Sequence, residues 1–348
     1  MRDGFVWCPY CAQPHKLEAR YCTATGMRLD PRVHRPSKHR VAPTPKVNKW
    51  IGTIVDGKYE ILRRIGAGGM GEVFEAENHV LKRRVAIKIV SAESSTAAAR
   101  LRREASMIAS MHHPNICNVY DVGEMPDGSP YLVLELLEGE TLNSLLRRCG
   151  RLSSSLTVEF FTQLLSSLQQ AHAIGIVHRD LKPANVFLVE RVGCRPLVKL
   201  LDFGLAKDVS GRYAKMTRPG EHCGTPGYMS PEQLTGKTID HRSDLFSVGT
   251  MLFECLTGRH PFAAATVAET SIQIVHDPPS VDLRSLPFSL PPGISEILAR
   301  ALQKAPELRY ASAVQMQMAL QNLRHLDEST PESETAARIG LPHLASSE

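Results

Sequence analysis

The sequence lacks any apolar run long enough to cross a membrane and contains few aromatic residues. Of its 348 residues, 43% are apolar and only 6% are aromatic. A membrane-spanning helix needs about 20 consecutive apolar residues, and residues 1–5 do not begin a secretory signal with an apolar core. We therefore expect a cytoplasmic protein without a membrane segment, and the chain is long enough to bury a substantial core.

Acidic residues are scarce at the start of the chain. Residues 1–50 contain ten Lys and Arg but only three Asp and Glu, which leaves 31 and 33 in the remainder. A basic segment can attract nucleic acid, yet a solvated linker is the commoner explanation. We therefore expect no nucleic-acid binding, and a nucleic-acid-binding regulator is the least favoured function for this chain.

Three of the eight cysteines lie near the start. Cys8 and Cys11 form a C-x-x-C pair that resembles the first knuckle of a zinc ribbon, and Cys22 begins a second knuckle in which Thr25 takes the place of the fourth thiolate. Structural Zn²⁺ takes four tetrahedral ligands, so His15, water or another donor would have to complete the site. The alternative is a degenerate ribbon without metal, with its thiols reduced, as a chain without an export signal favours.

Composition divides the rest of the chain. Residues 31–49 contain four Pro and six Lys or Arg without an acidic residue, which is typical of an extended linker. Residues 327–348 are rich in Glu, Ser and Thr, which predicts a disordered tail. We predict a ribbon-like module at 1–30, a basic linker at 31–52 and one large domain at 53–326.

The large domain changes character midway. Apolar and β-branched runs predict strands at 59–66, 73–78, 84–90 and 131–135, and a helix is predicted at 97–111. Beyond Gly139 the apolar residues recur at helical spacing. Two such sets are Phe161, Leu164, Leu165 and Leu168, then Leu245, Val248, Leu252, Cys255 and Leu256. We therefore expect an α+β architecture, with a β-rich lobe at 53–137 and a mainly helical lobe at 138–326.

The strongest chemical signal is the run H-R-D-L-K-P-A-N at residues 178–185, followed by D-F-G at 202–204. This combination is far more specific than a Gly-rich loop alone. It places a carboxylate base, Asp180, near two oxygen-bearing residues, Asn185 and Asp202, and predicts a phosphotransfer centre. Asp and Asn also favour turns and caps, but three of them in this frame argue against a purely structural role.

Other motifs appear in the matching order. I-G-A-G-G-M-G-E-V at residues 65–73 resembles a Gly-rich phosphate loop, and V-A-I-K at 85–88 follows on a predicted strand. With these motifs, residues 57–325 resemble a protein kinase domain of the serine/threonine class. The resemblance implies a bilobal fold that binds ATP together with Mg²⁺ or Mn²⁺.

The resemblance also implies how the β-rich lobe would bind ATP. Small residues in the loop let backbone amides approach the phosphates. Lys88 would hold the α- and β-phosphates, and Glu104 would pair with Lys88 in the active arrangement. Leu134 would be the gatekeeper, and the backbone of Glu135 and Leu137 would bind adenine. The implied ATP-binding residues are Ile65, Gly66, Ala67, Gly68, Gly69, Met70, Gly71, Val73, Ala86, Lys88, Leu134, Glu135 and Leu137.

In the helical lobe the resemblance assigns Asp180 as the catalytic base for the substrate hydroxyl. Lys182 would offset the charge that develops on the transferring phosphoryl group, and a Lys at this position resembles serine/threonine rather than tyrosine kinases. Asn185 and Asp202 would supply oxygen ligands to Mg²⁺, which prefers hard oxygen donors.

Further residues resemble supporting parts of such a domain. Thr225 would line the substrate pocket, and Asp244 would brace the catalytic loop through its backbone. Glu232 would form a structural ion pair with Arg309. Ser230 stands where Ala is more usual, a change too small to disturb Glu232.

Arg179, next to the catalytic base, is typical of kinases whose activation loop is ordered by phosphorylation. Thr217 is the favoured phosphosite by its distance from Thr225, and autophosphorylation is the expected route. The alternative is that Thr217 is an ordinary loop residue and that Arg179 bonds to backbone carbonyls.

Together these features predict an ATP-dependent serine/threonine protein kinase that acts on protein substrates. Residues 171–177, which enter the catalytic loop, resemble bacterial members of the eukaryotic-like class. Activation in trans would involve a transient homodimer. The alternative is a pseudokinase scaffold or interaction protein, but such proteins usually lose the lysine, the base or a metal ligand, and Lys88, Asp180, Asn185 and Asp202 are all present.

Overall fold

A computed structural model of the chain describes residues 5–7, 14–16, 49–68, 71–90, 105, 107–191, 193–203, 226–279 and 290–324. The chain divides into two compact units, Met1–Lys49 and Trp50–Glu348. In the first unit, strands β1 (Phe5–Trp7) and β2 (Pro14–Lys16) pair as an antiparallel hairpin. The cysteines of the predicted ribbon, Cys8, Cys11 and Cys22, lie outside the described residues.

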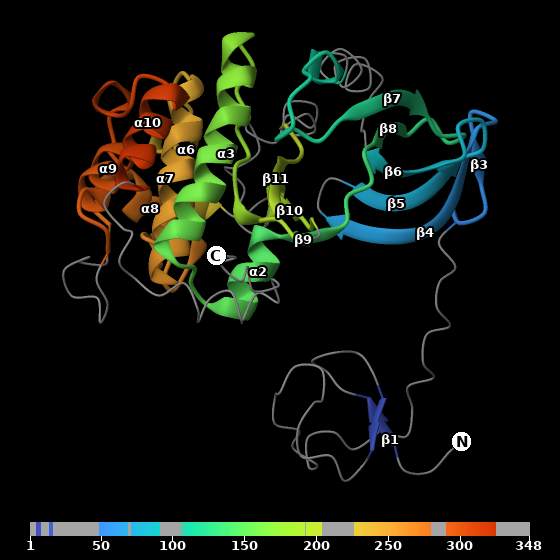
Figure 1. Cartoon of the computed structure of the whole chain (residues 1–348), viewed down its shortest axis with the longest axis horizontal. Helices are drawn as coiled ribbons and strands as arrows, with labels where there is room; N and C mark the ends of the chain where they lie inside the picture. The colour runs from blue at the N-terminus through green and yellow to red at the C-terminus, as the bar shows by residue number, and fades with distance from the viewer. Residues whose placement is uncertain are drawn as a thin grey trace, which may run out of the picture. The chain divides into compact units, whose positions relative to one another are not determined.

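The second unit begins with an antiparallel sheet in the order β3-β4-β5-β6-β8-β7 (Figure 1). Its strands are β3 (Ile54–Val55), β4 (Tyr59–Gly68), β5 (Gly71–Asn78), β6 (Arg83–Val90), β7 (Val119–Glu124) and β8 (Pro130–Leu134). The four predicted strands are confirmed as β4, β5, β6 and β8. The sequence does not predict β3, which has only two residues, or β7, in which Asp121 and Gly123 interrupt the apolar residues.

The sheet curls until strands that are distant in its order come together. Asp121 of β7 accepts hydrogen bonds from Lys58 Nζ at 2.6 Å and from the Tyr59 hydroxyl at 3.0 Å, next to β4. The apolar cluster inside the curl includes Ile61, Phe74 and Ile87, each fully buried. Trp50 also belongs to this cluster and is 8% exposed, so the packing of this unit reaches into the segment predicted as linker.

The predicted helix at 97–111 is described only at residue 105 and from 107 onward, where 105 and 107–109 are helical. Its buried members, Ala105 and Ile108, face the apolar cores. Glu104 lies outside the described residues.

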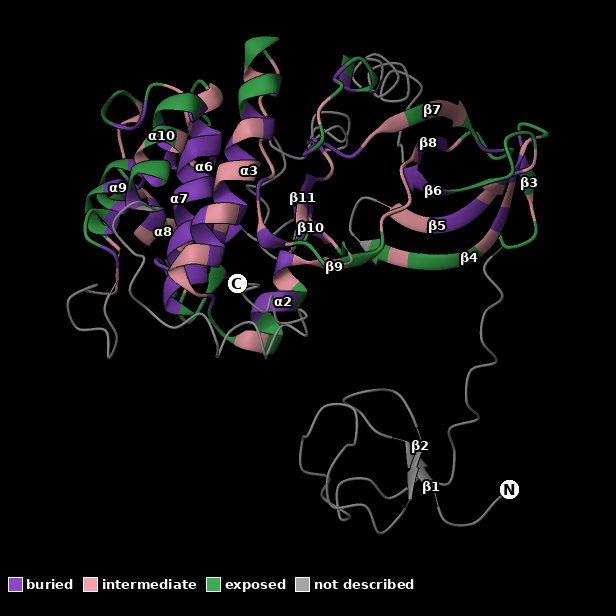
Figure 2. Cartoon of the chain, in the orientation of Figure 1, coloured by how far each residue is buried: buried purple, intermediate pink, exposed green. Residues whose placement is uncertain are grey.

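The later part of the unit is mainly helical, as predicted. Its helices are α2 (Leu142–Cys149), α3 (Ser154–Ala173), α6 (Pro231–Leu234), α7 (His241–Thr257), α8 (Val267–His276), α9 (Ile294–Ala301) and α10 (Ala313–Arg324). Helix α7 is buried along nearly its whole length, with the other helices around it (Figure 2). The two predicted apolar faces are confirmed on α3 and α7, where all nine residues are buried.

Local sequence explains where these central helices begin and end. The Ser153 side chain caps α3 by accepting from the Leu156 amide, and Asp240 caps α7 by accepting from the Arg242 amide. Gly258 ends α7 in the left-handed conformation that glycine adopts most easily. In the described part of the chain, no helix is both long enough and apolar enough to span a membrane.

A small antiparallel sheet lies between the large sheet and the helices, in the order β11-β10-β9 (Figure 1). Its strands are β9 (Gly139–Thr141), β10 (Val186–Val189) and β11 (Leu197–Leu200). Asn185 immediately precedes β10, and Asp202 follows β11 by two residues. Because β10 and β11 pair in register, the two predicted metal ligands are brought to the same end of this hairpin.

Candidate active site

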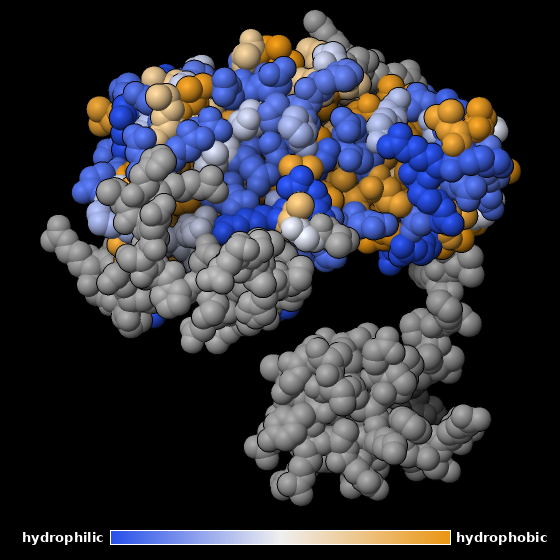
Figure 3. Space-filling view, in the orientation of Figure 1, coloured by the Kyte–Doolittle hydropathy of each residue, from blue (hydrophilic) through white to orange (hydrophobic). Residues whose placement is uncertain are grey.

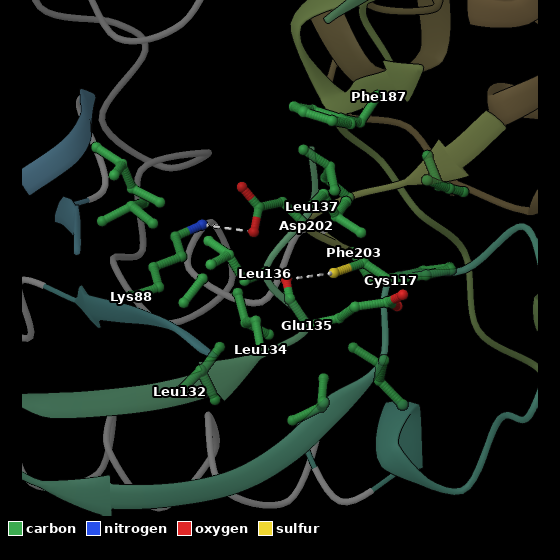
Figure 4. Close-up of a pocket in the computed structure, with 17 residues that line it drawn as sticks. Lys88, Cys117, Leu132, Leu134, Glu135, Leu136, Leu137, Phe187, Asp202 and Phe203 are labelled. Carbon is green, nitrogen blue, oxygen red and sulfur yellow. Dashed lines mark hydrogen bonds and ion pairs between the residues drawn. The ribbon is translucent and has the colours of Figure 1, made fainter. Parts of the chain in front are cut away.

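A cleft lies between the large sheet and the helical part. Hydrophobic side chains gather in this interval, with hydrophilic residues on either side (Figure 3). Strands β5, β6 and β8 supply one wall, and β10 and β11 supply the opposite wall (Figure 4). The lining residues are Ile65, Val73, Ala86, Lys88, Ile108, Cys117, Val119, Leu132, Leu134, Glu135, Leu136, Leu137, Phe187, Leu200, Leu201, Asp202 and Phe203.

Seven of the predicted ATP-binding residues lie in this lining: Ile65, Val73, Ala86, Lys88, Leu134, Glu135 and Leu137. Gly66, Ala67, Gly68 and Gly71 belong to the β4–β5 hairpin beside it, whereas Gly69 and Met70 lie outside the described residues. Gly71 has φ +141°, and a Cβ there would meet Ile89 O at 1.9 Å. Glycine is therefore required at this close approach of β5 to β6.

The sequence does not predict several aliphatic and aromatic members of the lining. Phe187 is the clearest of these, because it follows Asn185 by two residues and lies on β10, in the lining of the cleft (Figure 4). Its position in the motif could have indicated it. Cys117 belongs to no recognisable motif and reaches the cleft only through the tertiary fold.

Lys88 and Asp202 meet inside the cleft. Lys88 Nζ lies 2.7 Å from Asp202 Oδ1 (Figure 4), and Lys88 is only 8% exposed. Asp202 has φ +49°, an uncommon conformation for a residue other than glycine. The pair predicted between Lys88 and Glu104 involves a residue outside those described, and the described partner of Lys88 is Asp202.

Asp180, Lys182 and Asn185 form a second group beside Asp202. Lys182 Nζ donates to Asp180 Oδ2 at 2.9 Å, and Asn185 Nδ2 donates to Asp180 O at 2.8 Å and to Oδ2 at 3.2 Å. Because an amide nitrogen only donates, the remaining acceptor of Asn185 is Oδ1. This oxygen and the carboxylate of Asp202 are the hard donors that Mg²⁺ prefers, so the residues present fit the implied metal.

Asp244 binds the backbone of the loop at residues 178–185, a contact that the resemblance implied. Its carboxylate accepts from the amides of His178 and Arg179, each at 2.9 Å. His172 Nε2 lies 2.8 Å from the same carboxylate, a partner that the sequence does not indicate. Arg179 has φ +63°, a left-handed conformation that is uncommon for a residue other than glycine. The hydrogen bond from its amide to the Asp244 carboxylate helps to maintain this conformation.

His178 connects the loop to the strand that leads to Asp202. Its Nε2 lies 2.8 Å from Leu201 O, and its Nδ1 accepts from the Asp180 amide at 3.3 Å. Burial lowers the pKa of His178. A neutral imidazole fits these contacts, because one ring nitrogen donates and the other accepts.

The protein kinase domain family matches residues 59–322. Similar proteins include serine/threonine-protein kinase pkn3 of Myxococcus xanthus, which is 35% identical over 309 residues covering 86% of this chain and 56% of the relative. Serine/threonine-protein kinase Pkn1 of the same organism is 36% identical over 321 residues, covering 90% and 45%. Serine/threonine-protein kinase PknA of Mycobacterium tuberculosis is 39% identical over 269 residues, covering 75% and 60%. The chain belongs to the protein kinase family.

The predicted bilobal kinase fold is thereby confirmed, and these relatives are bacterial, as the resemblance implied. The chain spans about half the length of the curated relatives that it matches. The pair of Lys88 with Asp202 therefore lies in the cleft of a kinase domain, and the group around Asp180 belongs to the same domain.

A buried ion pair supports the helical lobe of the kinase domain, as predicted. Arg309 Nη1 lies 2.7 Å from Glu232 Oε1, and Arg309 Nη2 lies 2.7 Å from Glu232 Oε2. Ser243 Oγ donates to Oε1 of the same carboxylate at 2.5 Å. Burial by itself would raise the pKa of Glu232, but the hydrogen bonds from Arg309 and Ser243 outweigh it and hold that pKa below its ordinary value. Glu232 is therefore ionised at neutral pH.

The predicted phosphosite Thr217 and the predicted substrate-pocket residue Thr225 lie outside the described residues. Three residues after Thr225, the Tyr228 hydroxyl donates to Glu254 at 2.6 Å, and the Tyr228 carbonyl accepts from Ser247 at 2.7 Å. These contacts fasten the segment that follows Thr225 to helix α7, beside Asp180 and Lys182.

Proposed function

We propose that the chain is an ATP-dependent serine/threonine protein kinase that transfers the γ-phosphoryl group of ATP to Ser or Thr hydroxyls of protein substrates. The observation that carries the proposal is the arrangement of Asp180, Lys182 and Asn185 in contact with one another beside a cleft that contains Lys88 and Asp202. The names of the bacterial relatives support it. The test is transfer of radiolabel from ATP to a generic protein with Mg²⁺ present.

In this proposal the apolar cleft receives adenine, and the residues of the cleft orient the phosphates toward Asp180. The ammonium of Lys88 has the charge to hold the α- and β-phosphates. When Mg²⁺ is bound it neutralises charge on the phosphates, and Asn185 and Asp202 are the residues that would hold it. Asp202 has one carboxylate oxygen in contact with Lys88, so nucleotide and metal would compete with that contact.

Asp180 would accept the hydrogen bond of the substrate hydroxyl and take its proton late in the transfer. The nearby ammonium of Lys182, 2.9 Å from Asp180, would then offset charge on the transferring group. Pseudokinases usually lose the lysine, the base or a metal ligand, and this sequence retains all of them. No measurable label transfer with Mg²⁺ and ATP would favour that alternative. A cytoplasmic location remains a prediction from the sequence.

We also propose that activation involves phosphorylation of Thr217 by a second copy of the chain in a transient homodimer. The support is Arg179, which directly precedes Asp180 in the sequence and lines a small pocket with it, because a guanidinium is the group that pairs best with a phosphate. Mass spectrometry after incubation with ATP is expected to find phosphate on Thr217, and none in Asp180→Asn protein incubated alone. A fully active enzyme that is unmodified at Thr217 would contradict this proposal.

For the N-terminal module we propose that Cys8, Cys11 and Cys22 bind Zn²⁺ with one further donor. The support is the C-x-x-C spacing, because thiolates at this spacing are typical ligands of structural Zn²⁺. Elemental analysis of full-length protein purified with zinc is expected to give about one Zn²⁺ per chain for a four-ligand structural site, and a Cys8→Ser, Cys11→Ser variant is expected to lose it. Parent protein without zinc would refute the proposal.

A further inference from the structure

Residues 135–137, which follow β8 and lead toward the helical lobe, are called the hinge here. The carboxylate of Glu135, the first hinge residue, receives hydrogen bonds from two other segments. Lys199 Nζ of β11 lies 2.8 Å from Glu135 Oε2. Asn118 donates to the same oxygen from Nδ2 at 2.9 Å and from its backbone amide at 3.3 Å. The side chains of Lys199 and Glu135 are 7% and 22% exposed. This ion pair is largely withdrawn from water. Removing one partner of such a pair is destabilising, because the other charge is left buried and unpaired.

The backbone of Glu135 is fixed as well. Its amide donates to Asn118 O at 3.0 Å, and its carbonyl lies 3.9 Å from Cys117 Sγ, inside the cleft (Figure 4). Burial raises the pKa of the Cys117 thiol to about 12, so the sulfur stays protonated and can act only as a weak donor. The Glu135 carbonyl therefore keeps acceptor capacity on the side of the cleft.

The anchoring segment is itself attached to the strand that leads to Asp202. Residues 115–118 run beside β11, with Cys117 N donating to Leu200 O at 3.0 Å and Leu200 N donating to Asn115 O at 2.8 Å. Lys199 Nζ donates also to Ile116 O at 3.3 Å. A single buried ammonium thus joins the hinge, residues 115–118 and β11.

We propose that Lys199 is a positioning residue for nucleotide binding, which acts through Glu135 to hold the hinge carbonyl where the exocyclic amine of adenine would meet it. The inference rests on the proposed function, because it takes the cleft as the ATP site. Without Lys199, the Glu135 carboxylate would keep only Asn118 and would turn toward water. The hinge backbone would then lose its fixed orientation. Lys88, which would hold the phosphates, and Asp202, which would hold the metal, would keep their own contact.

The test is Lys199→Met in the full chain, which removes the charge and keeps the length and apolar stem of the side chain. We expect the KM for ATP to rise about tenfold, as for loss of one well-placed hydrogen bond, with kcat changed less than twofold. Lys199→Arg should restore most of the affinity. The matched control is Lys237→Met at an exposed lysine, which should match the parent.

Two ligands distinguish an effect on the adenine site from an effect on the phosphate site. Calorimetry should show weaker adenosine binding by Lys199→Met. The inhibition constant of tripolyphosphate, measured in competition with ATP, should be the same as for the parent. Equal weakening of the binding of both ligands would overturn the proposal, and so would an unchanged KM for ATP. A change in kcat alone would also overturn it, because it would indicate that the network controls lobe movement instead of nucleotide binding. Should Lys199→Met not fold, Glu135→Gln gives the same test. If the parent transfers no phosphate yet binds adenosine, the proposed function fails while this inference can still be measured.

Discussion

Replacing Asp180 by Asn is expected to lower kcat by about 10²- to 10⁴-fold, the usual contribution of a general base, while the fold and ATP binding are retained. Asn has the shape of Asp but cannot take the proton of the substrate hydroxyl. Its amide oxygen can still accept from Lys182 and Asn185, which lie 2.9 Å and 3.2 Å from Asp180 Oδ2. The loss should therefore appear in the chemical step and leave the KM for ATP nearly unchanged.

The measurement is radiolabel transfer to a generic protein at saturating ATP and Mg²⁺, with the melting temperature recorded for each variant. Asp127→Asn is the matched control, because Asp127 is exposed in the β7–β8 turn and caps the Ser129 amide. Asn can retain that cap, so this control should keep full activity. Equal incorporation by the parent and Asp180→Asn would exclude Asp180 as the base.

The sequence predicts those parts of the site that are encoded as local motifs. Asp180, Lys182 and Asn185 fall within eight consecutive residues, and their mutual contacts follow from one short loop. Lys88 and Asp202 are 114 positions apart in the sequence, yet each belongs to a motif whose spacing implied a common cleft. The predicted supporting contacts of Asp244 and of Glu232 with Arg309 are present for the same reason.

What the sequence could not indicate is the packing of polar side chains between motifs. Asn118, Lys199 and His172 belong to no periodic pattern, and each finds its partner through strand or helix placement that only the folded chain provides. Lys199 in particular is one charged residue in an apolar strand, which by pattern alone suggests a solvent-facing position. Its burial against Glu135 depends on residues 115–118 running beside β11.

Strand β7 illustrates the same limit at the level of the fold. Its alternation is weak because Asp121 faces Lys58 and Tyr59 across the curled sheet rather than solvent alone. A polar residue that is satisfied by a distant partner cannot be recognised from its neighbours in the sequence. Helix α7, by contrast, is predicted readily, because Leu245, Val248, Leu252, Cys255 and Leu256 recur at helical spacing and all face the core.

Arg309→Met is expected to reduce the free energy of unfolding by about 3–5 kcal/mol, the usual cost of removing one partner from a buried ion pair. Arg309 also donates to the carbonyls of Arg242, Gln303 and Lys304, and Met cannot replace those bonds. For a domain of this size each 1 kcal/mol lowers Tm by roughly 2–4 °C, so we expect a fall of about 10 °C. The control is Arg300→Met, an exposed arginine stacked on Tyr310, which should cost about 1 kcal/mol or less.

The pH dependence identifies the unpaired carboxylate as the cause. In the parent the pKa of Glu232 is held below its ordinary value, so the ion pair contributes stability above the pKa of the unfolded chain and loses it as the pH falls through the folded pKa. In Arg309→Met the hydrogen bonds from Arg309 are gone and only the one from Ser243 still opposes burial. The pKa of Glu232 therefore rises, which makes protonation at mildly acidic pH favourable to folding. The stability difference between parent and variant should therefore shrink from pH 7 to pH 5, and Glu232→Gln added to Arg309→Met should recover part of the loss at pH 7. A difference that is constant with pH, together with no recovery from Gln, would assign the loss to packing instead.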